Sequence, residues 1–214
     1  MTNVDNTISG AGQRGGGQLT LVNGGTILAN GSNALVIDTG TNAVGNSGTL
    51  EATGTGGLMI RSNVDNTGTL WANGGNLTVE GAVSGNGSAE IDGTSRLEFG
   101  AASTANTAFG TGDGTLKLAQ SAGFTGTIAG FGAGDAIDLA DLGFGGSTTL
   151  AYAANQDGSG GTLSVSDGTH STSLALLGQY AATGFQGASD PGAGTLITYT
   201  PPDANDPNLL TNPL

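Results

Sequence analysis

"VDNTGTLWANGGNLTVEG" occupies residues 64–81, and "VGNSGTLEATGTGGLMIRS" occupies residues 44–62. Both contain a valine, an asparagine within three residues, Gly-Thr, an apolar pair, a glycine-rich turn and a second apolar pair. Segments starting at Val22 and Val83 follow the same pattern, and the four starts are 22, 20 and 19 residues apart. Apolar residues two positions apart lie on one side of a β-strand. Each repeat therefore predicts two short strands joined by a turn.

A unit of this size is too small to bury its own apolar face and becomes stable by stacking on copies of itself. We therefore predict an all-β fold, a right-handed parallel β-solenoid of about five coils of ~20 residues, spaced about 4.8 Å apart. The repeat fades after Ala102. The expected organisation is a solenoid over residues 1–102, an irregular and partly antiparallel capping region over 103–199, and a proline-rich arm over 200–214.

Two columns of polar residues are expected from this alignment. An asparagine falls at the matching turn of three successive coils: Asn46, Asn66 and Asn86. Stacked amides of this kind hydrogen-bond from one strand layer to the next. The outward residue after the second apolar pair alternates in charge: Asp38, Arg61 and Glu80. The alignment therefore predicts a cation between two carboxylates at strand spacing.

Composition excludes several classes of protein. The chain has 214 residues, 42 of them glycine, no cysteine, only four Lys and Arg, and a formal net charge of −13. An acidic surface repels the phosphates of nucleic acid, so no nucleic-acid partner is expected. No apolar stretch approaches the roughly 20 residues that a membrane-spanning helix needs. Regular apolar pairs between the glycines favour a folded chain over a disordered linker.

Trp71 is the main candidate for binding a ligand. The strand period places it outward, between Glu51 and Glu90 of the neighbouring coils. An outward indole between acids could stack on a sugar ring or pack on a partner, and the alternative is that another segment of the chain covers it. The two acids would lie about 10 Å apart, slightly beyond the range for an inverting glycosidase. With one histidine, His170, and no GxSxG motif, we predict no enzymatic activity.

The C-terminal half resembles a known class of protein. "FTGTIAGFGAGDAIDLADLGF" (124–144) and "GGTLSVSDGTHSTSLALLGQYAATGFQGASDPGAGTLITY" (160–199) resemble the C-terminal segment of very large, Gly- and Thr-rich secreted bacterial surface proteins. "NSGTLEATG" (46–54) is similar to the β-helical repeats of autotransporter passengers and type I secreted adhesins. The resemblance implies a place outside the cell or on its surface, and such segments occur on proteins with many different roles.

Within this resemblance, "GFGAGDAIDL" (130–139) is similar to the calcium-binding nonapeptide of repeats-in-toxin proteins. It implies Asp135, Asp138 and Asp141 as candidate calcium ligands, and no other cofactor is expected. The stretch departs from the motif because Asp135 comes one residue early and no second copy follows. A calcium ion needs six to eight oxygens. The alternative interpretation is that these carboxylates lie at solvated turns and strand edges.

The sequence thus predicts a non-catalytic structural or adhesive module of an extracellular or cell-surface bacterial protein. A first alternative is a fibre subunit that binds copies of itself, by end-to-end stacking or through the arm. The arm would supply three leucines to a neighbouring copy: Leu209, Leu210 and Leu214. A second alternative is a module that binds polysaccharide or another cell-surface glycan through Trp71.

Overall fold

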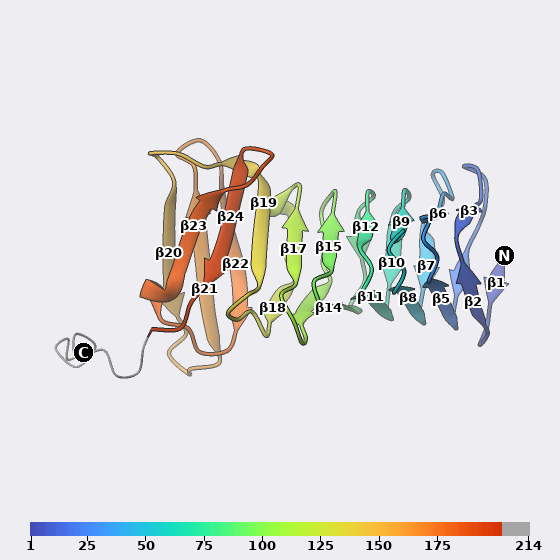
Figure 1. Ribbon diagram of the computed structural model, residues 1–214, viewed down its shortest axis with the longest axis horizontal. Helices are drawn as coiled ribbons and strands as arrows, with labels where there is room; N and C mark the ends of the chain where they lie inside the picture. The colour runs from blue at the N-terminus through green and yellow to red at the C-terminus, as the bar shows by residue number, and fades with distance from the viewer. Residues whose placement is uncertain (203–214) are drawn as a thin grey trace.

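Short parallel strands stack into a solenoid in the computed structural model, which describes residues 1–202 (Figure 1). Its strands form three sheets, called A, B and C here. Sheet A contains β1 (Thr2–Asn3), β4 (Val22–Asn23), β7 (Val44–Asn46), β10 (Val64–Asn66) and β13 (Val83–Ser84), in that order. All neighbours in sheet A are parallel, as stacked copies of one coil require.

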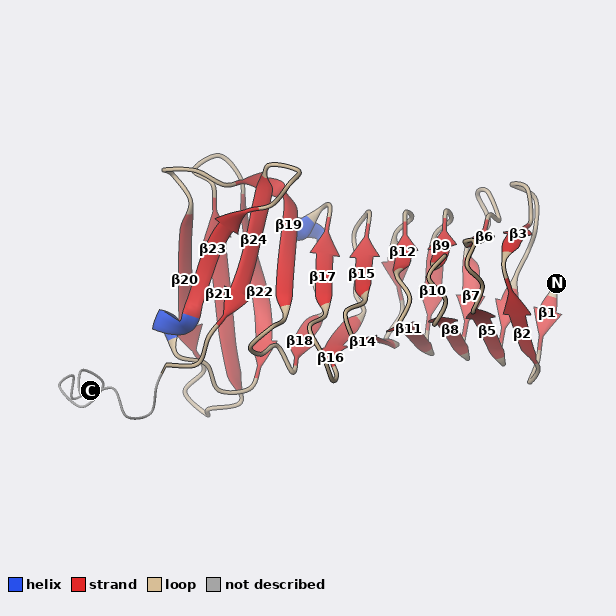
Figure 2. Cartoon of the chain, viewed as in Figure 1, coloured by secondary structure: helices blue, strands red, loops and turns tan. Residues whose placement is uncertain are grey.

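Sheets B and C run the length of the described chain (Figure 2). Sheet B has the order β2 (Thr7–Gly10), β5 (Thr26–Ala29), β8 (Thr49–Ala52), β11 (Thr69–Asn73), β14 (Ser88–Asp92), β16 (Asn106–Phe109), β18 (Thr127–Ala129), β22 (Ser171–Leu177), β21 (Gly160–Ser166) and β20 (Thr149–Ala154). Sheet C has the order β3 (Gly12–Arg14), β6 (Leu35–Ile37), β9 (Leu58–Ile60), β12 (Leu77–Val79), β15 (Arg96–Phe99), β17 (Thr115–Leu118), β19 (Ala136–Gly143), β24 (Gly194–Tyr199) and β23 (Phe185–Ser189).

The predicted parallel β-solenoid is confirmed, but it has about seven coils rather than five and continues past Ala102. The two further coils contain β16 with β17 and β18 with β19. In these coils sheet A is reduced to single bridges from Val83 to Ser103 and from Ser103 to Phe124. The valine–asparagine part of the repeat is therefore missing there, which hides the coils from a search for the whole pattern.

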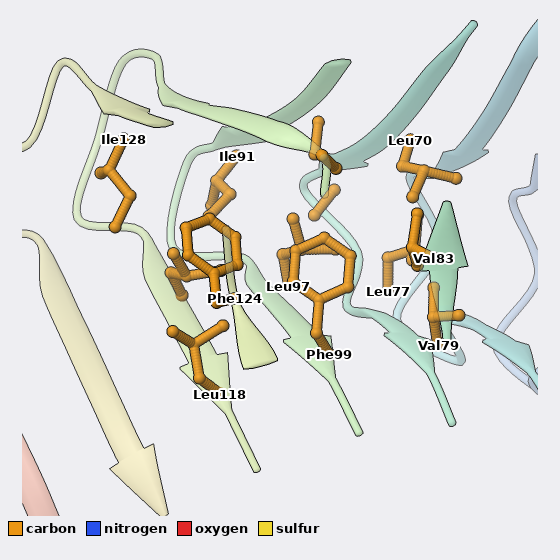
Figure 3. Packing of buried hydrophobic residues seen from close by; sticks show 14 of the residues in the cluster. Leu70, Leu77, Val79, Val83, Ile91, Leu97, Phe99, Leu118, Phe124 and Ile128 are labelled. Carbon is orange, nitrogen blue, oxygen red and sulfur yellow. The ribbon is translucent and has the colours of Figure 1, made fainter. Parts of the chain in front are cut away.

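The interior is a continuous stack of the predicted apolar pairs (Figure 3). One inward column of sheet B grows in size toward the C-terminal end, from Ala72 through Ile91 to Phe109. Phe99 and Phe124 stack with their ring centroids 6.2 Å apart. Larger side chains thus fill the coils that precede the cap, as the close packing of protein interiors requires.

The alignment at Val22 is wrong by one residue. Val22 pairs with Gly45 rather than with Val44, and it is 45% exposed. Leu21, which is 0% exposed, points inward instead. Successive strand residues face opposite sides, so a slip of one residue exchanges a core position for a surface position.

Glycine recurs in the turns because each turn lies directly on the backbone of the preceding coil. A β-carbon at Gly48 would overlap the carbonyl oxygen of Gly25, and one at Gly68 would overlap that of Gly48. Coils at strand spacing leave no room for a side chain at these points. The glycine content therefore follows from the stacking of the turns.

The cap continues sheets B and C instead of forming a separate body. β22 pairs parallel with β18, and β21 and β20 follow it antiparallel. β24 and β23 extend sheet C antiparallel from β19. Between the two sheets lies an aromatic cluster, in which adjacent ring centroids are 4.9–6.5 Å apart: Phe131, Tyr152, Tyr180, Phe185 and Tyr199. The predicted antiparallel strands at the C-terminal end are thus confirmed.

Two 3-10 turns, Ser121–Gly123 and Ala182–Gly184, are the helical segments of residues 1–202. Within that range, no helix is long and apolar enough to cross a membrane.

Candidate functional site

A buried ladder of asparagine amides runs along the inner side of sheet A. The amide nitrogen of Asn3 donates to Asn23 Oδ1 at 2.8 Å, Asn23 donates to Asn46 at 2.9 Å, and Asn46 donates to Asn66 at 2.8 Å. All four side chains are buried. The ladder ends where Asn66 Nδ2 donates to the carbonyl oxygen of Ser88 at 3.1 Å. Each amide therefore connects consecutive coils in a polar column inside an apolar core.

Asn86 is not part of this ladder, contrary to the expectation from the sequence. Val64 pairs with Val83, so Asn66 falls opposite Gly85, and Asn86 lies one residue further on and is exposed. The shorter coil thus moves the third asparagine out of the column. Sequence reasoning also missed Asn3 and Asn23, although each is the last residue of a short strand of sheet A, as Asn66 is in its coil.

The charged column is aligned as predicted but is not ion-paired. The register of β9 with β6 and β12 places Arg61 between Asp38 and Glu80. Arg61 is exposed, and the ion pairs found in residues 1–202 do not include it. Exposed ion pairs of this kind contribute little to stability, so little free energy would be gained by bringing Arg61 into contact with Asp38 or Glu80.

Ion pairs form instead on the later strands of sheet C. Arg96 lies 3.3 Å from Glu98, and Lys117 Nζ lies 3.5 Å from Asp138 Oδ2. The register aligns Glu98, Lys117 and Asp138 on neighbouring strands. A second column of alternating charges, with ion pairs, therefore lies on the three strands of sheet C that follow β12.

Trp71 lies outward on sheet B between Glu51 and Glu90, as predicted. Its indole is half-buried, and Nε1 donates to Asp92 Oδ2 at 2.8 Å. Asn73 Nδ2 donates to Glu51 Oε1 at 2.8 Å. Both the ring and one flanking carboxylate are therefore held in place by neighbours, which sequence reasoning did not identify.

Asp92 orients the indole because it is itself fixed. The backbone N–H of Thr111 donates to Asp92 Oδ1 at 2.9 Å. This bond, followed by the bond from Trp71, lowers the pKa of Asp92, since both donors favour the ionised carboxylate. No pocket is present in the part of the chain that the structure describes.

The candidate calcium ligand Asp135 accepts hydrogen bonds from two backbone N–H groups. Its Oδ1 accepts from the N–H of Gly114 at 3.0 Å, and its Oδ2 accepts from the N–H of Gly132 at 2.9 Å. Burial raises the pKa of Asp135, and these two hydrogen bonds oppose that effect. Oδ1 therefore connects the turn before β19 to the coil below, and Oδ2 closes that turn itself.

Asp138 and Asp141 do not join Asp135 in one site. Asp138 faces Lys117, and Asp141 Oδ2 accepts from the N–H of Ser121 at 2.8 Å. Burial raises the pKa of Asp138, Lys117 opposes this, and the nearby carboxylate of Asp190 adds to it. Residues 1–202 contain no group of three or more His, Cys, Asp or Glu placed to hold a metal ion. Calcium binding stays a prediction.

His170 lies exposed in the hairpin between β21 and β22. Its Nδ1 is 3.2 Å from Asp167 Oδ2. Asp167 Oδ1 accepts from the backbone N–H groups of His170 at 2.6 Å and Thr169 at 2.7 Å. These bonds hold the pKa of Asp167 well below its usual range. The pair thus shapes the turn between β21 and β22.

No protein-family model, curated protein or solved structure matches the chain. The solenoid is compatible with β-helical repeat proteins, and the resemblance to secreted surface proteins stays a prediction. The predicted assembly arm with Leu209, Leu210 and Leu214 lies outside the described residues.

Proposed function

We propose that this chain is a stiff, non-catalytic structural or adhesive module of an extracellular or cell-surface bacterial protein. The observation that carries the proposal is the continuity of sheets B and C, of ten and nine strands, from the first coil into the cap. Nine strands at about 4.8 Å spacing extend about 40 Å. A module of this shape separates what is attached at its two ends by a fixed distance.

The buried amide ladder supports the same role. Coils that met only through apolar contacts could slip relative to one another, because apolar contacts are not directional. The four asparagines have partners at 2.8–2.9 Å in one register only. A module that transmits force or maintains a spacing benefits from such a register.

The location is tested on intact cells that produce the protein. An antibody against the exposed cap loops should bind intact cells, and added protease should remove that signal. Labelling that requires permeabilised cells would contradict the proposed location.

Stiffness is tested separately by pulling the purified chain between handles at its two ends in an optical trap. Stepwise rupture of coils is expected, at a force lowered by Asn46→Ala and unchanged by Asn86→Ala. Smooth extension at low force, as for an unfolded chain, would contradict the mechanical role.

Polysaccharide binding is a second candidate, favoured by the arrangement around Trp71. Asp92 holds the indole and Asn73 holds Glu51, so a stacking surface and a hydrogen-bond acceptor are fixed before any ligand arrives. Sugars bind proteins through such combinations of aromatic faces and carboxylates.

A glycan array probed with wild type, Trp71→Ala and Thr78→Ala tests this second candidate. Thr78 lies outward in β12 of sheet C, so it provides the control. Binding lost only in Trp71→Ala would support a glycan site. Binding that is absent in wild type, or equal in all three proteins, would exclude one at Trp71.

A further inference from the structure

We propose that copies of this chain assemble head to tail, with the first coil of one copy pairing with the cap edge of the next. The inference does not rest on the proposed extracellular location. It concerns the four strands that begin and end the two long sheets: β2, β3, β20 and β23.

The two long sheets have free edges at opposite ends of the molecule (Figure 1). β2 begins sheet B and β3 begins sheet C in the first coil, whereas β20 and β23 end the same sheets in the cap. Within residues 1–202, each of these strands pairs on one side only. A second copy placed at either end could therefore extend both sheets at once.

The edges lack the features that usually prevent such pairing. Natural edge strands are blocked by charged side chains, proline or bulges. The edge strands β2 (TISG), β20 (TLAYAA) and β23 (FQGAS) contain no charged residue and no proline, and they pair with their neighbours without a bulge. β3 is the exception, because it ends in the half-buried Arg14.

Apolar side chains are exposed near both ends. Met1, Val4 and Val22 are 43%, 70% and 45% exposed at the first coils. At the cap, Phe144 is 42% exposed, and together with Leu150 it lies against Gly187 of β23. An end-to-end contact would remove this apolar surface from water as well as completing backbone hydrogen bonds.

The charge distribution selects head-to-tail pairing over cap-to-cap pairing. From residue 118 to residue 202 the sequence contains six Asp and no Lys or Arg. Residues 1–37 contain one acid, Asp5, and one cation, Arg14, besides the N-terminal amine. Two caps would repel each other, whereas a nearly neutral first coil can approach a cap. A head-to-tail contact between unlike surfaces continues into a filament unless it closes into a ring.

Two alanines of sheet B provide a matched test. Ala153 of the edge strand β20 and Ala175 of the inner strand β22 both pair with Thr162, and both are exposed. Ala153→Lys and Ala175→Lys therefore add the same charge to the same row of the sheet, but only the first blocks the edge. Ser9→Lys blocks the other end, because Ser9 is exposed in β2.

Sedimentation velocity and negative-stain microscopy over a concentration series read out assembly. We expect species larger than the monomer for wild type and Ala175→Lys, and their loss in Ala153→Lys and in Ser9→Lys. An equimolar mixture of Ala153→Lys and Ser9→Lys should form dimers and nothing larger, since each variant keeps one open end. Circular dichroism spectra should be the same for all variants.

Several results would overturn the proposal. A wild type that stays monomeric at every concentration would exclude it. Dimers of Ala153→Lys alone would indicate contact between two first coils. A truncation after Pro202 distinguishes pairing of the strand edges from binding by the arm. Either a gain or a loss of assembly on truncation would indicate that residues 203–214 occupy the edge. Assembly unchanged by truncation and abolished by Ala153→Lys supports pairing of the strand edges.

Discussion

Replacing Asn46 with alanine tests whether the amide ladder holds the coils together. The change removes the donor to Asn66 Oδ1 at 2.8 Å and the acceptor of Asn23 Nδ2 at 2.9 Å. Asn23 Nδ2 keeps bonds to the carbonyl oxygens of Gly25 and Thr49. The loss on that side is therefore one net hydrogen bond, worth about 0.5–1.5 kcal/mol.

The larger loss falls on Asn66, whose Oδ1 becomes a buried acceptor without its donor. Leaving such a group unsatisfied costs about 1–3 kcal/mol. Together the two effects lower the free energy of unfolding by about 1.5–4.5 kcal/mol for Asn46→Ala.

Urea unfolding measures these changes, followed by circular dichroism and by the fluorescence of Trp71, the only tryptophan. The exposed Asn86 provides the control, and Asn86→Ala should change stability by less than about 0.5 kcal/mol. The reasoning would be refuted if the two alanine variants were equally stable within that margin.

Three further predictions follow from single contacts. Gly48→Ala should lower the free energy of unfolding by more than about 1 kcal/mol, because the new β-carbon overlaps backbone of the coil below. Gly146→Ala, at a position with open space, should stay near wild type in the same urea titration. The pKa of Asp92 is lowered, so its stabilising effect is present above its ordinary pKa near 3.8 and is lost as the pH falls through the folded-state value. Trp71 emission should change over that acidic range, and a change that persists in Asp92→Asn would contradict the assignment. The pKa of Asp138 is raised, so its stabilising effect is present below 3.8 and is lost as the pH rises through the folded-state value. Asp138→Asn should therefore raise the melting temperature at neutral pH but not at acidic pH, and equal effects at both would refute this.

Much of the fold could be predicted because its signals are local. Apolar pairs two residues apart specify strands, and glycine specifies turns that touch the coil below. The register of Trp71 with Glu51 and Glu90 followed from the same repeat. The coils after Ala102 were missed because they keep the apolar pairs but lose most of sheet A.

The sites were less predictable, because they depend on which residues meet across coils. The spacing changes from 23 residues between Thr26 and Thr49 to 19 between Thr69 and Ser88. A change of one residue decides whether an asparagine enters the core, as Asn66 does, or points to solvent, as Asn86 does.

The sequence by itself determined the all-β fold, the parallel stacking and the antiparallel end, since strand period and glycine turns act over a few residues. Only the tertiary structure decided which polar groups are paired. In the folded chain Asp135 accepts hydrogen bonds from two backbone N–H groups, and the Trp71 indole donates one to Asp92. Contacts of this kind join residues about 20 positions apart, and their geometry depends on the exact length of each turn.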